Sequence, residues 1–256
     1  VLVILQRYDL QPVGWEEIDH FCRPESGAIC YAWLNSESKP MQLAKAGYQV
    51  VIATANHLYF DFASCNHHQE KGLSWGGYTD EYRSFDWEPA QHENIIGMSA
   101  QLWSEVIRTF SQVEWQLYPK ILGLAERSWN AAYNANGTLL DYNHRSKLSL
   151  GDYNHLVYNV HLPRLAANGH NFHIQQPGIR KVATENEQLQ LDKSHVLIEM
   201  NKVMQGGEIW YCLDDGEWKV YTNTIAIPAT TQVVKAKVRY LGKESNTTWL
   251  WLSSGR

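Results

Sequence analysis

The sequence predicts two parts, an α/β region over residues 1–176 and an all-β region over residues 177–256. Before about residue 175, short apolar runs alternate with segments of helical periodicity. After it, strand-like runs follow one another at intervals of roughly 8–12 residues. Between the two regions lies the polar stretch NGHNFHIQQPG, which ends in Pro-Gly. We therefore expect a domain boundary near Pro177.

The first region alternates strands and helices. Residues 27–34 (GAICYAWL) and 48–54 (YQVVIAT) are continuous apolar runs, typical of buried strands, and residues 38–46 between them predict a short helix that ends at Gly47. The remaining elements expected here are a strand at 95–103 and helices at 113–129 and 152–166. Strands that alternate with helices form a parallel sheet with crossover helices.

The second region consists of short strand-like runs separated by turn residues. They lie at 196–200, 209–213, 218–221, 233–240 and 248–252. Asp214-Asp215-Gly216 stands between two of them and is a strong hairpin signal. Short strands joined by such turns predict a β-sandwich.

Composition excludes several classes of function. The chain has 256 residues, of which 44% are hydrophobic and 19% charged, and its net charge is −5. It can therefore bury a core, and its mild acidity argues against nucleic-acid binding, which needs a basic face. No run of about 18 apolar residues predicts a membrane span. The opening VLVILQRYDL contains neither an initiator Met nor a cleavage site, so we expect neither a signal peptide nor a natural N-terminus there.

Cysteine and histidine spacing predicts neither a metal nor a cofactor. The four cysteines, at 22, 30, 65 and 212, form no CxxC or Cys/His pattern. Cys22 and Cys30 either form a bridge in an oxidising compartment or remain two buried thiols, and the sequence leaves both open. His67-His68 are adjacent, and adjacent histidines on a loop usually point apart into solvent.

Aromatic residues are the unusual feature of the composition. Eleven Trp and fourteen Tyr accompany only six Phe. Such side chains either fill a core or bind ligands with flat apolar faces and polar edges, of which sugars are the commonest. Many lie at the ends of predicted strands, as residues do at the carboxyl face of a (β/α)8 barrel. The four strands expected here would make half of such a barrel. These positions are Gly14-Trp15-Glu16-Glu17, Ala32-Trp33, Leu58-Tyr59-Phe60-Asp61, Trp75-Gly76-Gly77 and Leu102-Trp103-Ser104-Glu105.

The order of these motifs resembles glycoside hydrolase family 20, the β-N-acetylhexosaminidases, and its bacterial chitobiase-like branch in particular. In that family, strands end in W-x-E, lead into Y-[LF]-D, and end in L-W-[SG]-E. The segment YPKILGLAERSW at 118–129 resembles the helix that follows, YPR-x-x-[AG]-x-A-E-x-x-W. Residues 207–216 and 233–237 resemble a hairpin and a strand of the C-terminal domain, so the resemblance covers nearly the whole chain.

The resemblance implies a (β/α)8 TIM barrel followed by a small immunoglobulin-like domain. On that map this chain supplies strands 5–8, the C-terminal half of the barrel. The H-x-G-G-D-E signature at the end of strand four has no match, because Asp80-Glu81 lacks the preceding His-Gly-Gly. The general acid and its neighbouring Asp are therefore expected upstream, in the missing N-terminal half of the barrel.

The resemblance also implies a substrate-assisted retaining mechanism, in which the 2-acetamido oxygen of the sugar attacks the anomeric carbon. Tyr59 would be the catalytic donor to that oxygen, since a phenol is neutral at pH 7 and rigid. Trp15 and Trp103 would form walls around the terminal sugar. Trp33 is expected to pack inside the fold, with a role in the pocket as the alternative.

Three further positions are expected to bind substrate. Trp75 would stack under the next sugar, with a loop anchor as the alternative. Asp61 and Glu105 would accept hydrogen bonds from the O4 and O6 hydroxyls, with a salt bridge to an Arg as the alternative.

Two hypotheses follow. One is part of a periplasmic or secreted exo-β-N-acetylhexosaminidase, a hydrolase of chitin degradation that acts on chitobiose-like oligosaccharides with terminal N-acetylhexosamine. The other is a non-catalytic remnant that binds N-acetylhexosamine. Open sheet edges and an exposed apolar inner face argue against a half barrel that folds alone. The sequence does not separate N-acetylglucosamine from N-acetylgalactosamine.

Overall fold

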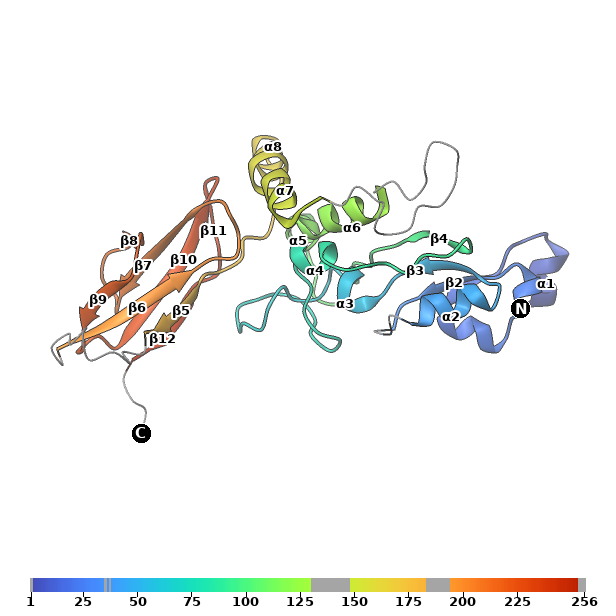
Figure 1. The fold of residues 1–256 in the computed structure, drawn as a ribbon, viewed down its shortest axis with the longest axis horizontal. Helices are drawn as coiled ribbons and strands as arrows, with labels where there is room; N and C mark the ends of the chain where they lie inside the picture. The colour runs from blue at the N-terminus through green and yellow to red at the C-terminus, as the bar shows by residue number, and fades with distance from the viewer. Residues whose placement is uncertain (1, 35, 37, 130–147, 183–193, 253–256) are drawn as a thin grey trace. The chain divides into compact units, whose positions relative to one another are not determined.

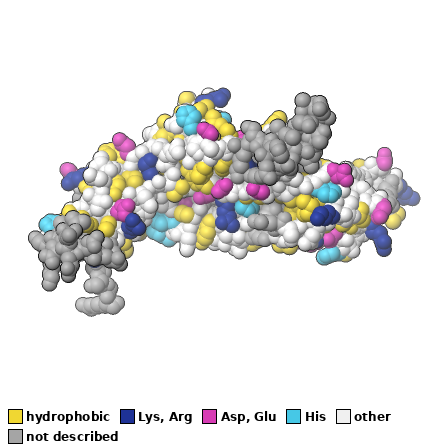
Figure 2. Space-filling view, in the orientation of Figure 1, with side chains coloured by type: hydrophobic (Ala, Val, Ile, Leu, Met, Phe, Trp, Pro, Cys, Tyr) yellow, Lys and Arg dark blue, Asp and Glu magenta, His cyan; other side chains and the backbone are white. Residues whose placement is uncertain are grey.

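The computed structural model describes residues 2–34, 36, 38–129, 148–182 and 194–252 (Figure 1). The chain forms two compact units, Val1–Leu150 and Gly151–Arg256. Within the described ranges, no helix has the length and apolar character to cross a membrane. On the face drawn in Figure 2, Lys and Arg side chains are scattered among Asp and Glu. The domain boundary expected at residues 176 and 177 stays a prediction.

The first unit is built on a four-stranded parallel sheet. Its strands pair in chain order, and their parallel pairing is what the alternation of strands and helices predicted. Three of them are shorter than the apolar runs at 27–34, 48–54 and 95–103 that predicted them, because the last residues of each run leave the sheet. The strands are β1 (Val13–Trp15), β2 (Ile29–Ala32), β3 (Gln49–Ile52) and β4 (Ile95–Met98).

The pairing of β3 with β4 contains a bulge. Val50 faces Ile95, and the next residue, Val51, faces Gly97. Ile96 is therefore an extra residue in β4, and its side chain is half exposed. A bulge of this kind bends its strand and re-aims the side chains that follow it.

Helices of the first unit cover the sheet and connect its strands. Helix α2 confirms the helix expected at 38–46, and it buries Leu43 and Ala44 in a core that also contains Val50. Cys22 and Cys30 belong to the same core, where both are buried free thiols. The helices are α1 (Leu2–Arg7), α2 (Lys39–Lys45), α3 (Ala55–Leu58), α4 (Glu81–Phe85), α5 (Phe110–Leu117) and α6 (Lys120–Trp129), with 3₁₀ turns at Glu16–His20 and Pro24–Ser26.

The single helix expected at 113–129 is wrong, because Pro119 divides it. Proline lacks an N–H donor and disfavours helical conformation in the residue before it. Tyr118 is accordingly extended, with φ −98° and ψ 133°. Helix α5 starts at a capping box, in which Thr109 Oγ1 accepts from the Gln112 amide at 3.3 Å and Gln112 Oε1 accepts from the Thr109 amide at 3.2 Å.

The second unit begins with a helical run and continues in antiparallel sheets. The helix expected at 152–166 is confirmed as α7 (Leu150–His155), a π-helical segment (Leu156–His161) and α8 (Leu162–Ala167). One sheet has the order β5-β6-β9, and the other has the order β11-β10-β7-β8 with β12 also on β10 (Figure 1). Their bounds are β5 (Gly178–Lys181), β6 (His195–Asn201), β7 (Glu208–Leu213), β8 (Lys219–Val220), β9 (Ile225–Pro228), β10 (Val233–Tyr240), β11 (Lys243–Glu244) and β12 (Thr248–Trp251).

The hairpin predicted at residues 214–216 is confirmed. Strands β7 and β8 pair antiparallel around it, and the Gly216 amide donates to the Leu213 carbonyl at 2.9 Å. Asp214 has φ 51°, a left-handed conformation that Asp tolerates. Alternate residues of β10 are buried, as expected for a strand with one face in a core. The immunoglobulin-like assignment of this unit stays a prediction.

Candidate functional site

A pocket of about 350 Å³ lies at the carboxyl ends of the parallel strands. Trp15 is the last residue of β1, and Trp33 follows the last residue of β2. Ligands of parallel α/β sheets bind at this end, in pockets of roughly 300–1,000 Å³. The lining residues are Trp15, Glu17, Trp33, Tyr59, Leu73, Trp75, Trp103 and Glu105. The sheet thus brings together five of the six predicted site residues, all except Asp61.

Aromatic rings form most of the pocket wall. The Trp33 ring lies nearly parallel to that of Tyr59, with centroids 6.3 Å apart and 16° between planes. Trp75 meets both rings edge-on, at 6.1 Å from Trp33 and 6.2 Å from Tyr59. Trp15 and Trp103 lie 5.9 Å apart at 49°. Trp15, Trp75 and Trp103 are 37%, 59% and 40% exposed, so their faces are accessible to a ligand.

Tyr59 is placed rigidly at the end of α3. It is 3% exposed, its amide donates to the Ala55 carbonyl at 3.0 Å, and it pairs with Gln101 in an isolated parallel bridge. Burial raises the pKa of the Tyr59 phenol to about 12, against a smaller opposing effect of the Trp103 side chain. The phenol therefore stays neutral and keeps its O–H donor through the physiological pH range.

Asp61 is fully buried and is not among the lining residues. Neither carboxylate oxygen has a hydrogen-bond partner among the described residues. Burial is the main cause of a raised pKa for this carboxyl, and the charge of Glu105 raises it further. The amides of Asp61 and Trp103 and the charge of Lys120 oppose that rise, although neither amide makes a hydrogen bond of ordinary geometry to the carboxylate.

The loop that carries Trp75 is fastened to the Asp61 segment by a close backbone approach. Leu73 donates to the Asp61 carbonyl at 2.9 Å, and Ala63 donates to the Leu73 carbonyl at 2.8 Å. Gly72 has φ 132°, and a Cβ there would lie 2.4 Å from the Ala63 nitrogen. Only glycine fits this position, so the loop geometry depends on it.

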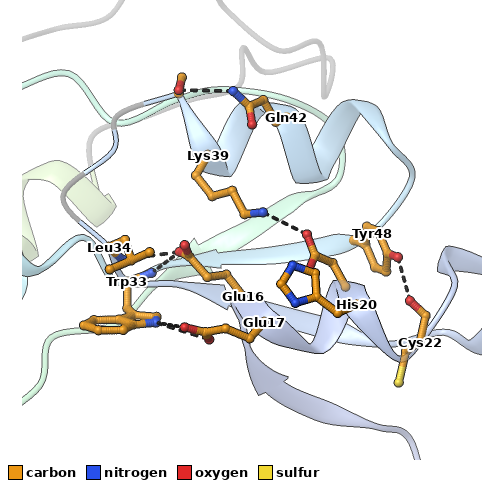
Figure 3. Close-up of polar contacts among 11 residues, drawn as sticks. Glu16, Glu17, His20, Cys22, Trp33, Leu34, Lys39, Gln42 and Tyr48 are labelled. Atoms are coloured by element: carbon orange, nitrogen blue, oxygen red, sulfur yellow. Dashed lines mark hydrogen bonds and ion pairs between the residues drawn. The ribbon is translucent and has the colours of Figure 1, made fainter.

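Three lining residues lie outside the predicted set, Glu17, Trp33 and Leu73. Trp33 was expected to pack inside the fold, with a pocket role as the alternative; its indole packs on the cluster of Tyr59 and Phe62 and also lines the pocket, because β2 ends at Ala32. The indole Nε1 donates to the two carboxylate oxygens of Glu17 at 3.1 and 3.3 Å (Figure 3). The position of Trp33 at the end of a strand, like that of Trp15, was the signal for a pocket role.

Glu16 supports the same wall from inside the fold. Its side chain is 3% exposed, and its Oε2 accepts from the backbone amides of Trp33 at 2.9 Å and Leu34 at 3.3 Å (Figure 3). Glu16 and Glu17 therefore hold the backbone and the indole of one tryptophan. Among the described residues, no group of three or more His, Cys, Asp or Glu side chains is arranged to hold a metal ion.

Comparison with known proteins identifies relatives of this chain, and the matched family model covers every residue that lines the pocket. Residues 1–132 match the model of glycosyl hydrolase family 20, catalytic domain. The N,N'-diacetylchitobiase of Vibrio harveyi is 25% identical in an alignment of 247 positions that covers 81% of this chain and 26% of that protein. A β-hexosaminidase of Vibrio furnissii is 29% identical in an alignment of 121 positions that covers 44% of this chain and 20% of that protein. The chain thus spans about a fifth to a quarter of the length of these relatives.

Solved structures agree. An inactive mutant of the exo-β-N-acetylglucosaminidase of Vibrio harveyi is 25% identical, with a TM-score of 0.54 over 66% of this chain and 25% of that one. The β-N-acetylhexosaminidase of Streptomyces coelicolor A3(2) is also 25% identical, with a TM-score of 0.55 over 68% and 35%. The fold is accordingly of the TIM-barrel-containing α/β type. With 132 of its 256 residues matched to the catalytic domain, the chain belongs to glycosyl hydrolase family 20.

Proposed function

We propose that this chain is part of an exo-β-N-acetylhexosaminidase that removes terminal N-acetylhexosamine from β-linked oligosaccharides such as chitobiose. The observation that carries the proposal is the aromatic pocket, in which Tyr59 and Glu105 lie among four tryptophans. Flat indole faces suit the apolar face of a sugar, and the polar groups suit its edge. The names of the relatives, β-hexosaminidases and a diacetylchitobiase, support the substrate class.

The proposed reaction is substrate-assisted and retaining. The acetamido oxygen of the substrate attacks the anomeric carbon while the bond to the leaving oxygen breaks, and a general acid protonates that oxygen. Water then opens the cyclic intermediate. Tyr59 donates its phenolic hydrogen to the acetamido oxygen, and a pKa of about 12 keeps that hydrogen in place at neutral pH.

The walls and the acceptors have separate roles in this proposal. Trp15, Trp33 and Trp103 enclose the terminal sugar, and Trp75, the most exposed of the pocket tryptophans, stacks under the next sugar. Glu105 faces the pocket and accepts from the sugar hydroxyls. Asp61 is proposed as a second acceptor for the same hydroxyls; because it is fully buried behind the pocket wall, it has to become accessible when the sugar binds.

The general acid is proposed to lie upstream, in the first half of the barrel. Support comes from the sheet, because β1 and β4 have no further strand partner among the described residues, whereas a barrel closes its edges. The Asp-Glu pair of this chain has structural contacts instead. Asp80 accepts from the Arg83 amide at 2.8 Å as the cap of α4, and Glu81 is buried in that helix.

The remaining parts of the proposal concern the second unit and the location. Residues 177–256 are proposed to form an immunoglobulin-like sandwich, supported by the two antiparallel sheets. A periplasmic or secreted location is proposed from the family alone.

The test is hydrolysis of p-nitrophenyl N-acetyl-β-D-glucosaminide by this chain and by a polypeptide extended upstream through the missing strands. We expect activity only in the extended protein. Activity in the short chain would place the acid among its own carboxylates and contradict the upstream assignment. If neither protein is active but both bind N-acetylglucosamine, the chain is a binding remnant.

A further inference from the structure

Lys120 is a buried lysine at the first position of α6. Its side chain is 1% exposed, although lysine is almost never fully buried without partners. The Nζ donates to the Phe60 carbonyl at 2.9 Å, to the Phe62 carbonyl at 2.6 Å and to Gln116 Oε1 at 3.2 Å. All three ammonium hydrogens therefore have acceptors, and each bond is strengthened by the charge.

The two carbonyls on which Lys120 acts lie on either side of Asp61. Other contacts fasten the same segment at different points, since Phe60 donates to Gln101 at 2.8 Å and the Asp61 carbonyl accepts from Leu73. None of these other contacts satisfies the carbonyls of Phe60 and Phe62. Replacing Lys120 by an apolar side chain would leave both carbonyls with an unmet acceptor in a buried place.

The ammonium also acts on the carboxylate between those carbonyls. Burial of Asp61 and the charge of Glu105 favour the neutral acid, and Lys120 is the cation that opposes them. Neutralising Asp61 would replace an acceptor-only group by one that carries a proton. The charge on Lys120 therefore favours the ionised form of this buried carboxyl.

We propose that Lys120 is a positioning residue of the sugar pocket, which holds the Tyr59–Asp61 segment in place through the carbonyls of Phe60 and Phe62. The inference rests on the proposed function, since it gives Tyr59 and Asp61 their role toward N-acetylhexosamine. It adds a second requirement for binding, a protonated amine that never touches the sugar.

The requirement has a pH signature. Burial lowers the pKa of Lys120 to about 8, against the opposing charges of Glu70, Glu81, Asp61 and Asp80. Glu70 lies in the loop before Trp75, Asp80 and Glu81 are the cap and first residue of α4, and Asp61 lies next to Phe60 and Phe62. Helix α5 contributes the uncharged Gln116. Above about pH 8 the amine loses its charge and one of its donors. Tyr59 does not titrate in this range.

The experiment is a tryptophan-fluorescence titration of the whole chain with N-acetyl-D-glucosamine at pH 7 and pH 9.5. With a pKa of about 8, roughly 3% of Lys120 is protonated at pH 9.5, so the apparent Kd should rise by up to about thirtyfold. Lys120→Arg, which stays charged, should bind with little difference between the two pH values. Lys120→Met should bind weakly at both.

A matched control is Lys45→Met, at an exposed lysine of α2, which should behave as the unsubstituted chain. Circular dichroism at both pH values separates weakened binding from unfolding. Equal binding by the unsubstituted chain at pH 7 and 9.5 would overturn the inference and leave the proposed function standing. If Lys120→Met does not fold, two measurements still test the inference: the binding of the unsubstituted chain at pH 7 and 9.5, and the binding of Lys120→Arg at the same two pH values. No binding at pH 7 by either this chain or the upstream-extended protein would overturn both.

Discussion

The buried carboxylate of Asp61 is expected to lower the stability of the fold and to support sugar binding. The side chain has no exposed surface and neither oxygen has a partner among the described residues. Replacing it by the isosteric amide, Asp61→Asn, removes the charge and keeps the shape. We expect this variant to be more stable than the unsubstituted chain and to bind N-acetylhexosamine less well.

The magnitude follows from the cost of unpaired buried groups. A buried polar atom without a partner costs about 1–3 kcal/mol, and a charged one costs more. The amide still leaves polar atoms buried, and its neutral side chain loses the attraction of Lys120. That attraction is smaller than the effect of burial in the pKa of Asp61. The net rise in the free energy of unfolding should be about 1–2 kcal/mol, or roughly 2–8 °C in melting temperature for a unit of this size.

Thermal unfolding followed by tryptophan fluorescence between pH 4 and 7 measures the effect. The pKa of Asp61 is raised in the folded state, so protonation stabilises that state and the stability is lost as pH rises through the folded pKa. The advantage of Asp61→Asn should therefore be largest at pH 7 and shrink toward pH 4. Asp9→Asn, at an exposed aspartate, is the control and should change little.

Two results would refute this reasoning. One is a melting temperature that falls at pH 7 in Asp61→Asn, which would mean that the carboxylate makes stabilising contacts. The other is an advantage that does not vary with pH, which would mean that the charge is not its cause.

Four other substitutions or conditions test the remaining assignments. Tyr59→Phe in the upstream-extended protein should lower kcat by about 10²–10³ with a smaller change in KM, because the phenol acts on charge that develops in the transition state. Trp75→Ala should weaken chitobiose binding by roughly twofold to tenfold in fluorescence titrations, as expected for one lost stacking contact, and leave N-acetylglucosamine binding unchanged. Gly123→Ala should lower the free energy of unfolding by about 1–3 kcal/mol in urea, since its Cβ would lie 2.3 Å from Ser84 Oγ, whereas Gly97→Ala meets no atom within 4 Å. The stability of the chain should rise from pH 8 toward pH 10, even as sugar binding falls, because the lowered pKa of Lys120 makes the unfolded state bind more protons there; Lys120→Met should lack this rise.

Much of the pocket was predictable from where residues stand in the chain. Trp15, Tyr59 and Trp103 were each placed at the end of a predicted strand, and parallel strands bring their carboxyl ends together. Packing was preferred for Trp33 because its run was assigned wholly to the strand, when only four of its residues pair. Periodicity likewise joined α5 to α6, although Pro119 was the local signal that divides them.

Lys120 could not have been predicted to be buried. Lysine is ordinarily a surface residue, and its acceptors at Phe60 and Phe62 are 60 and 58 residues away in the chain. No local pattern carries such a contact. The environment of Asp61, whose carboxylate has no hydrogen-bond partner within the part of the chain that the structure describes, is hidden from the sequence for the same reason.

The bulge at Ile96 makes β4 a strand of fixed length. Residues along a strand alternate between its faces and advance about 3.3 Å each. Deleting Ile96 would restore regular pairing with β3. The deletion would also shift the residues that follow Ile96 by one position along the strand, which would turn the Trp103 side chain away from the pocket. Natural variation at position 96 should therefore take the form of exchanged side chains, half exposed as this one is, and insertions or deletions should be confined to the loops outside residues 95–103.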